Sequence, residues 1–417
     1  MTVSPRKPIN RWRLLASCVL SFVNGNQDSA LGALIPFIES YYHIGYATVA
    51  LLFLTTAVGF IAAAFTCDVI LASIGRARIL MLATATMTIG YIIWVVAPGR
   101  TPYGFLVVAP LFTGAGVSWN LAQINVFVSS LDKPTLYNGY LHGCYGIGGV
   151  VGPLVATSLA SHGVPWQYFY FLPLGVTIFN FFFAGYIFLP TESEKQVLLE
   201  DAQERQLRAQ TQSDTASQAS DTPLTRILET LKNKPTILTS LFILSYQGAE
   251  VSLGGWIVSF LISSRDGNPA NVGYVASGFW GGVTVGRFLL SGLCSMIGER
   301  RAVVTLLAGS VVMEILVWLV PNVIGSAVSV ALVGFLLGPI YPCTMGVITR
   351  LLSRKLQVSS LSFIAAFGSS GGALWPFSIG LISQFKGPFV VHSVAIASFV
   401  LMEVLWVLLP KVPKRIV

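Results

Sequence analysis

The stretch Gly148-Gly149-Val150-Val151-Gly152-Pro153 returns 223 residues later as Gly371-Gly372-Ala373-Leu374-Trp375-Pro376. Other marks return at the same offset: Gly25, Ser29 and Gly32 as Gly248, Ser252 and Gly255, Ile74-Gly75 as Ile297-Gly298, and Phe112 as Phe335. Two copies of one helical unit therefore make up the chain. In membrane carriers, such duplication places a solute site near the bilayer midplane, between two halves that rock about it. The repeat thus indicates transport.

The composition is that of an integral membrane protein. Hydrophobic residues make up 54% of the 417 residues and charged residues only 10%, whereas about a quarter of a soluble domain is charged. We expect an all-α fold with twelve transmembrane helices in two pseudo-symmetric six-helix halves, at residues 1–190 and 236–417, joined by a cytoplasmic loop at 191–235. Apolar stretches of membrane length predict spans near 14–38, 46–71, 78–97, 103–129, 137–160, 166–189, 236–262, 271–297, 302–320, 323–349, 357–383 and 389–409.

The distribution of basic residues predicts the orientation. Of the 25 Lys and Arg, 21 fall on one side of the predicted spans, and only Arg100, Arg265 and Lys386 fall in loops on the other side. The positive-inside rule then places both termini and the central loop in the cytoplasm, which requires an even number of spans. The basic excess is explained by topology, so no nucleic-acid partner is implied. We expect a monomer in the lipid bilayer, in the plasma membrane rather than an internal one.

The sequence gives no support to an enzyme. It has no phosphate-binding glycine loop with lysine, no metal-ligand spacing among its four histidines, and no nucleophile paired with a base. The five cysteines lie in or at the ends of predicted spans, without the spacing of a disulfide framework. We therefore expect no cofactor, no metal and no catalytic residue, and transport driven by a gradient rather than by ATP.

Several motifs resemble those of the major facilitator superfamily over nearly the whole chain. The stretch from Ser277 to Gly282, with Gly286-Arg287 and Gly298-Glu299-Arg300-Arg301, is similar to the loop motif that follows the second helix of each half in that superfamily. The first-half copy is Asp68 with Gly75-Arg76-Ala77-Arg78, at a longer gap. The resemblance implies gate roles for Asp68, Arg76, Arg78, Arg287 and Arg301, with a buried counter-ion as the alternative for Arg287.

Within the superfamily, the chain most resembles the fucose permease-like (fucose:proton symporter) group and its fungal relatives. The fucose permease carries an acidic residue in its fourth span, whereas the corresponding stretch here, 118–123, carries none. The resemblance implies a sugar or polyol as solute. The segments that carry it are Asn24-Gly25-Asn26-Gln27-Asp28 with Pro36, His142-Gly143 with Tyr145, Glu250 with Gly254-Gly255-Trp256, Gly338-Pro339 with Tyr341-Pro342, and Phe367-Gly368 with Gly371-Gly372 and Trp375-Pro376.

Glycines crowd two of the predicted spans just before a proline. Small residues let helix backbones approach closely, and proline loosens the helical hydrogen bonding. Tight packing alone would explain the pattern. Because it recurs in both halves, we favour a conformational pivot at Gly148, Gly149, Pro153, Gly371, Gly372 and Pro376.

Charged residues inside membrane spans normally face a cavity or a partner. Asn24, Gln27 and Asp28 share one face of a helix, as do Gln247 and Glu250, and the offset maps Gln27 onto Glu250. A structural hydrogen bond is the alternative for each carboxylate. We predict that Asp28 and Glu250 carry a coupling proton, and that Glu314 and Glu403 are structural.

Amides beside aromatic rings suit a neutral polyhydroxylated ligand, because they exchange hydrogen bonds with hydroxyls while a ring covers the apolar face of a sugar. Packing is the alternative for single aromatic residues and for His142. The predicted solute-binding residues are Asn24, Gln27, Asp28, Trp119, Asn120, Gln123, His142, Tyr145, Gln247, Glu250, Trp280, Tyr341, Phe367 and Trp375.

The sequence thus predicts a secondary carrier that moves a small polar solute, with proton coupling as an option. One alternative is a proton antiporter that exports an amphipathic or toxic metabolite, because Gly148-x-x-x-Gly152-Pro153 resembles the fifth-helix motif of drug and proton antiporters. Another is a membrane sensor of the same fold that does not transport.

Overall fold

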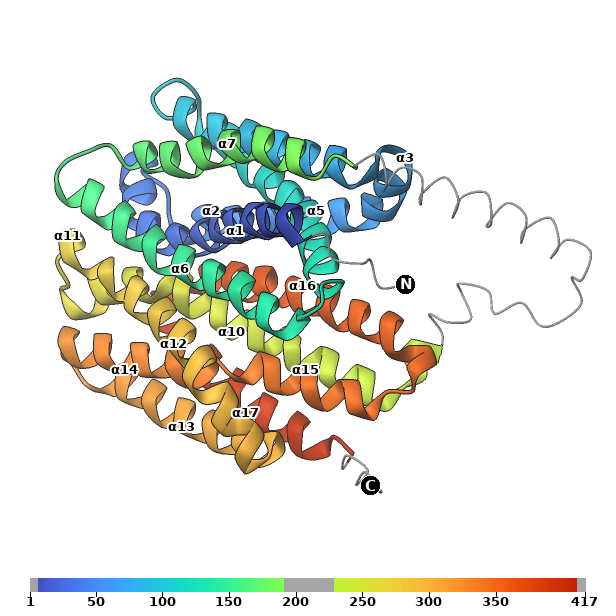
Figure 1. Cartoon of the computed structure of the whole chain (residues 1–417). Coiled ribbons are helices and arrows are strands. Elements are labelled where there is room, and N and C mark those ends of the chain that lie inside the picture. The colour runs from blue at the N-terminus through green and yellow to red at the C-terminus, as the bar shows by residue number, and fades with distance from the viewer. Residues whose placement is uncertain (1–6, 191–228, 411–417) are drawn as a thin grey trace, which may run out of the picture.

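The computed structural model describes residues 7–190 and 229–410, which form helices and short connections without a strand in these two ranges. Most of the predicted central loop lies outside the described residues. Figure 1 shows the helices as one bundle, with the blue-to-green part of the chain above the yellow-to-red part.

The first part contains α1 (Lys7–Tyr42), α2 (Tyr46–Val49), α3 (Leu51–Val96), α4 (Tyr103–Leu106), α5 (Ala109–Ser129), α6 (Pro134–Ser161), the 3-10 helix η1 (Trp166–Tyr170) and α7 (Phe171–Ile187). The second contains α10 (Lys234–Arg265), α11 (Pro269–Val272), α12 (Tyr274–Ile297), α13 (Glu299–Leu319), α14 (Val323–Leu337), α15 (Ile340–Leu351), α16 (Arg354–Lys386) and α17 (Val390–Leu408).

Eight helical segments in the described residues are long and apolar enough to cross a membrane, which confirms a multi-pass membrane protein. They do not include α1, α10 and α16, which are long but carry more polar residues. One of the eight, Tyr46–Val96, has 51 residues and is bent at Gly75. Twelve crossings stay a prediction.

Two glycines of the repeat make equivalent turns. Gly75 has φ 76° where α3 bends, and Gly298 has φ 98° between α12 and α13. Side chains other than glycine are strained in this left-handed region. The repeated Ile-Gly pair therefore marks the points where one long helix turns directly into the next.

Glycines also bring helix backbones into direct contact. A Cβ at Gly148 of α6 would collide with the carbonyl oxygen of Phe22 on α1, and one at Gly371 of α16 would collide with that of Leu244 on α10. Gly32 of α1 packs in the same way on Gly254 and Gly255 of α10, so the two copies of one repeated mark, Gly32 and Gly255, meet. The predicted close packing is confirmed at these positions.

The bundle has two ends, which we name by the chain segments that lie there. The turns at 43–45, 97–102, 162–165, 266–268, 320–322 and 387–389 form what we call the loop end. The opposite end, here the tail end, holds the first residues of α1 and α10 and the last residues of α7 and α17. In Figure 1 the loop end is on the left, near α11.

At the tail end, two arginines bind the last backbone carbonyl groups of neighbouring helices. Arg13 of α1 donates hydrogen bonds to the carbonyl oxygens of Ile187, the last residue of α7, and of Leu189, two residues later (3.0 and 3.3 Å). Arg300 of α13 donates to the carbonyl oxygens of Val407, Leu409 and Pro410 at the end of α17. The last carbonyls of a helix lack partners within it, and these two guanidinium groups supply them.

We predict that Gly148→Ala destabilises the protein by about 1–3 kcal/mol, the usual cost of forcing an extra group into a filled site. Gly139→Ala on the same helix is the matched control, since its Cβ would have no atom within 4 Å and alanine favours helix. Thermal unfolding of the detergent-purified variants measures both effects. Equal unfolding temperatures for the two variants would show that the α1–α6 contact is not tight.

Candidate functional site

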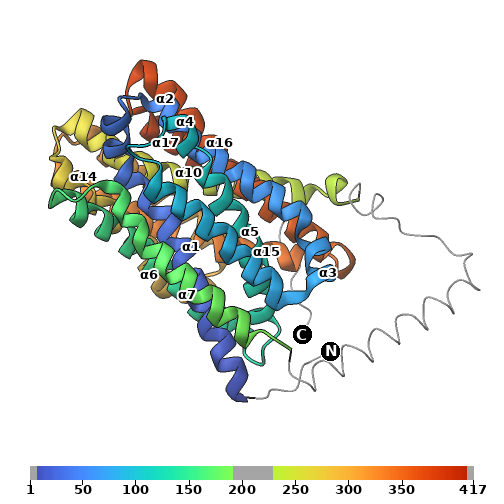
Figure 2. The same cartoon turned by 90° about the horizontal axis from the view of Figure 1, so that it is seen from above.

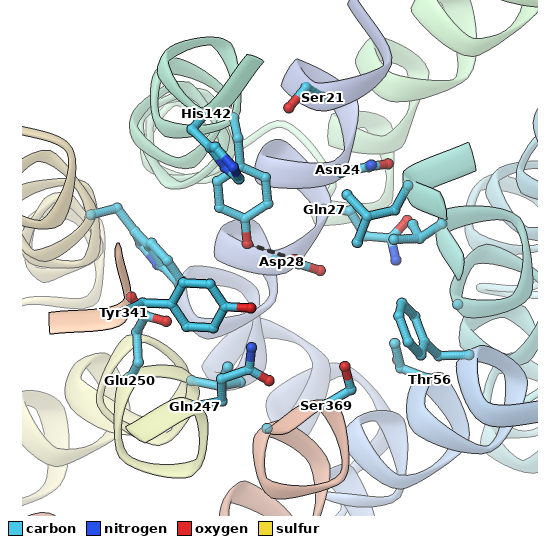
Figure 3. Close-up of a pocket in the computed structure, with 18 of the residues that line it drawn as sticks. Ser21, Asn24, Gln27, Asp28, Thr56, His142, Gln247, Glu250, Tyr341 and Ser369 are labelled. Carbon is cyan, nitrogen blue, oxygen red and sulfur yellow. Dashed lines mark hydrogen bonds between the residues drawn. The ribbon is translucent and has the colours of Figure 1, made fainter. Parts of the chain in front are cut away.

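A cavity of about 620 Å³ lies between the first and second parts of the chain. Its wall includes residues of α1, α3, α5 and α6 on one side and of α10, α12, α15 and α16 on the other. Figure 3 shows Asp28 near the centre, with His142, Tyr341, Glu250 and Gln247 around it. The cavity continues to Asn138 and Ser291, toward the tail end of α6 and α12.

The carboxylate of Asp28 faces this cavity. Its Oδ2 accepts a hydrogen bond from the hydroxyl of Tyr145 on α6 (2.7 Å), and its side chain is exposed to the cavity. It forms no ion pair with another described residue. A charge at this depth is costly unless it is hydrated or neutralised, so Asp28 is a place where a proton or a solute group can bind.

Two amides beside Asp28 are held by other helices. Gln27 accepts a hydrogen bond from the hydroxyl of Tyr91 on α3 (2.7 Å), which leaves its NH2 group free to turn to the cavity. Asn24 and Asn120 of α5 exchange two hydrogen bonds, at 2.8 and 3.1 Å, and both are buried. Asn24 reaches the cavity wall, whereas Asn120 lies behind it and fixes the Asn24 amide.

The opposite wall carries an ion pair. Arg287 of α12 donates to Oε1 of Glu250 on α10 at 3.1 Å, and the hydroxyl of Tyr246 donates to the same oxygen at 2.8 Å. The Glu250 side chain is 9% exposed and that of Arg287 is 22% exposed. This pair is neutral overall, because the guanidinium balances the carboxylate.

We expected Arg287 to form a gate salt bridge at a helix end. It lies in the cavity wall instead. It is the buried counter-ion of Glu250. Tyr246 was missed in the sequence, although it lies four residues before Glu250 and thus on the same helix face.

Most predicted solute-binding residues line the cavity, and five do not. The nine in the wall are Asn24, Gln27, Asp28, His142, Tyr145, Gln247, Glu250, Trp280 and Tyr341. Trp119 turns to α3, where its indole N–H donates to the carbonyl oxygen of Ala63 (2.9 Å). Trp375 turns to α17 and donates to Ser398 (2.9 Å). Asn120 and Gln123 are buried behind the wall, and Phe367 packs on Phe363 of its own helix.

Other polar side chains in the wall could not be predicted from the sequence. Thr56, Thr284 and Ser369 line the cavity, but single hydroxyl residues are frequent in membrane helices and usually bond their own backbone. All three do so here.

The predicted pivot residues take different positions. Pro153 and Pro376 lie inside α6 and α16. Gly148 and Gly371 make the backbone contacts described above, whereas Gly149 faces Trp280 of α12 across the two parts of the chain and Gly372 lines the cavity.

The predicted charged gate is not assembled here. Asp68 and Arg78 are exposed on α3, Arg301 is exposed at the start of α13, and Arg76 is half-buried. Within the described residues, none of these four takes part in an ion pair, and the nearby ion pair joins Arg350 to Glu299 (2.9 Å).

The loop end of the cavity is closed by contacts between the two parts of the chain. Gln384 of α16 accepts a hydrogen bond from the backbone N–H of Ala47 on α2 (3.2 Å). Trp256 of α10 packs on Tyr46 and Phe53, with ring centroids 5.9 and 6.0 Å apart. Figure 2 shows α3 and α16 beside each other, and residues of these two helices are in contact.

Comparison with known proteins identifies relatives over most of the chain. "Bypass of stop codon protein 6" of Saccharomyces cerevisiae (strain ATCC 204508 / S288c) is 26% identical over 419 residues, covering 97% of this chain and 83% of that protein. A "Quinolone resistance transporter" of Acinetobacter baumannii is 22% identical over 244 residues, covering 57% of this chain and 56% of that protein.

Two solved structures share the fold at low identity. That of a D-xylose-proton symporter has a TM-score of 0.73 at 10% identity, covering 97% of this chain and 98% of its own. That of the nucleoside transporter NupG also has a TM-score of 0.73, at 11% identity, covering 96% of this chain and 100% of its own. These likenesses show the fold alone.

The family assignment rests on a match that spans most of the bundle. The profile of the Major Facilitator Superfamily matches residues 17–376, from α1 into α16. The closed loop end, the cavity between two parts of the chain and the shared fold agree with that match. This chain therefore belongs to the Major Facilitator Superfamily.

Proposed function

We propose that this transporter moves a small polar solute, a sugar or polyol, by alternating access and couples its movement to protons at Asp28. The observation that carries the proposal is the cavity between the two parts of the chain, closed at the loop end and presenting an unpaired carboxylate. The fold shared with a sugar symporter supports it.

The charges of the wall favour a neutral solute. The acidic and basic residues among those that line the cavity are Asp28, Glu250, Arg287 and His142. Arg287 is already bound to Glu250, so when His142 is uncharged an organic anion would find no free cation and would face Asp28. Once Asp28 is protonated the wall is neutral, and the amides of Gln27 and Gln247 with the hydroxyl of Tyr341 offer hydrogen bonds to a polyol.

The partners of the two predicted proton carriers, Glu250 and Asp28, indicate which of them binds the coupling proton. Glu250 is stabilised as a carboxylate by Arg287 and Tyr246, so its deprotonated form needs no further partner. Asp28 has only the Tyr145 hydroxyl. We therefore assign the coupling proton to Asp28 and a structural role in the wall to Glu250.

We also propose the topology expected from the sequence. Twelve crossings in two six-helix halves follow if α1, α10 and α16 cross and if α3 crosses on each side of Gly75. With both termini cytoplasmic, the tail end faces the cytoplasm and the cavity is closed to the other side. Location in the plasma membrane and a monomeric state complete this proposal.

Export of an amphipathic compound is the second candidate. The wall near the loop end is aromatic, with Phe53, Trp94 and Tyr170, and Trp280 joins it from the second part of the chain. Such a surface would hold an apolar ring system as well as the face of a sugar.

A ligand screen with purified protein tests the choice of solute. A bound solute raises the unfolding temperature by mass action, and we expect this for a hexose or polyol and for no organic anion. Stabilisation by amphipathic compounds alone would favour export. Uptake of the stabilising compound into proteoliposomes then separates a carrier from a sensor, which would bind without transport.

We predict that Asp28→Asn abolishes proton-driven accumulation but retains counterflow exchange, because the amide keeps a hydrogen bond with Tyr145 and cannot release a proton. Glu403→Gln, a carboxyl change outside the cavity, should leave both activities unchanged. Uptake with and without a pH gradient measures the difference. Normal accumulation by Asp28→Asn would refute the assignment.

We predict that Arg287→Gln destabilises the protein by up to about 3 kcal/mol, because it leaves a buried carboxylate without its cation. Adding Glu250→Gln should restore most of that loss. Arg350→Gln breaks a more exposed pair (44% and 23% exposed side chains) and should cost less than about 1 kcal/mol. Thermal unfolding of the four proteins gives the comparison, and equal losses for Arg287→Gln and the double variant would count against the ion pair.

We predict that joining Ala47→Cys to Gln384→Cys with a cleavable bifunctional thiol reagent stops transport, because the loop end must open in each cycle. Glu299→Cys with Arg350→Cys, on two helices of the second part, is the control and should leave transport intact. Both pairs are made in a chain without its five native cysteines. Full transport by the cross-linked Ala47–Gln384 pair would exclude opening at this end.

A further inference from the structure

A second group of titratable side chains lies outside the cavity, in the interior of the second part. Nδ1 of His392 on α17 is 2.6 Å from Oε1 of Glu314 on α13, and both side chains are fully buried. The remaining polar atoms, Nε2 of His392 and Oε2 of Glu314, have no hydrogen-bond partner among the described residues. We expected a structural role for Glu314, and a single hydrogen bond to His392 would be enough for that role.

Counting protons shows that the pair has two protonation states, each of which leaves one buried group unsatisfied. A contact of 2.6 Å between a ring nitrogen and a carboxylate oxygen contains one proton. With that proton only, the pair carries one negative charge in a buried site, which is costly. With a second proton the pair is neutral, but Nε2 then bears an N–H without an acceptor, at a cost of about 1–3 kcal/mol.

The surroundings reduce the difference between these states. The ring of Phe260 on α10 meets the ring of His392 edge to face, at 4.1 Å between centroids. The guanidinium of Arg265, in the last turn of α10, lies 5.0 Å from the centroid of Phe260 and donates to the carbonyl oxygen of Trp318 on α13. Its positive charge favours the negative state of the pair, while an aromatic face can weakly accept an N–H.

Two further charged residues lie at the loop end: Asp266, which directly follows Arg265, and Lys386, the last residue of α16. The other charged residues of the surrounding helices lie farther along the chain. On α13, the charges at 299–301 lie at the opposite end, roughly 20 Å away at 1.5 Å per residue. Glu250 on α10 and Glu403 on α17 are each separated from Phe260 or His392 by about three turns. Arg350 of α15 and Arg287 of α12 have other partners, and α14 carries no charge.

We propose that Glu314 and His392 form a second proton-binding site, separate from the cavity and reached from the loop end. His392 is the third residue of α17, so one turn separates it from the connection at 387–389. Phe260 lies one turn beyond Trp256, which closes the cavity. The pH on the loop side would therefore act on how α13 and α17 hold the closing segment of α10.

Histidine NMR tests this directly, because the chain has only four histidines. His43→Gln, His142→Gln and His162→Gln together leave His392 as the sole histidine without altering the pair. With 15N-labelled histidine in lipid nanodiscs, we would follow the ring-nitrogen signals of His392 from about pH 8 to about pH 5, and we expect them to report the binding of a second proton to the pair. Signals that stay unchanged across this range would reduce the pair to a structural hydrogen bond.

Two variants separate this site from the cavity. Glu314→Gln removes the carboxylate, so the signals of His392 should change by a different pH profile or cease to change; an unaltered profile would overturn the pairing. Asp28→Asn should leave the His392 titration as it is, whether or not it alters transport. A His392 profile that changes with Asp28→Asn would show that the two sites are one system.

Discussion

Direct backbone contact between helices is the constraint on which the rest of this structure depends. Where Gly148 meets Phe22 and Gly371 meets Leu244, α6 lies against α1 and α16 against α10 without an intervening side chain. Three of these helices, α1, α6 and α10, carry Asp28, Tyr145, Gln247 and Glu250, so the same contacts fix the positions of these polar groups within each wall of the cavity. Any residue larger than glycine would separate the helices and move the polar groups with them.

The two walls solve the problem of buried charge differently. On α10 the carboxylate of Glu250 is neutralised by Arg287 and hydrogen-bonded by Tyr246. On α1 the carboxylate of Asp28 has a hydrogen bond but no cation among the described residues. One wall therefore holds a charge-balanced ion pair. In the other wall, the charge of Asp28 is balanced only by a proton or a group that enters the cavity. The two walls thereby hold carboxylates with distinct chemical roles, one residue apart in the 223-residue offset.

Much of this arrangement could be predicted from the sequence. The 223-residue offset identified Gly75 and Gly298, which share a left-handed conformation, and the polar faces with Asp28 and Glu250, which do line the cavity. Helical spacing gives the face of a residue but not its neighbour. Trp119 and Trp375 therefore could not be assigned, because each bonds an adjacent helix. The partner of Arg287 depended likewise on how α12 packs on α10, which no local pattern specifies.

The clamp of Arg300 on the end of α17 bears on how the chain is made. α17 is the last described helix to leave the ribosome, and its final carbonyl groups have no partner within the helix. The guanidinium that receives them belongs to α13, synthesised about a hundred residues earlier, and the indole of Trp406 donates back to the carbonyl oxygen of Arg300. The end of α17 is thus satisfied only when this late helix docks on a much older one.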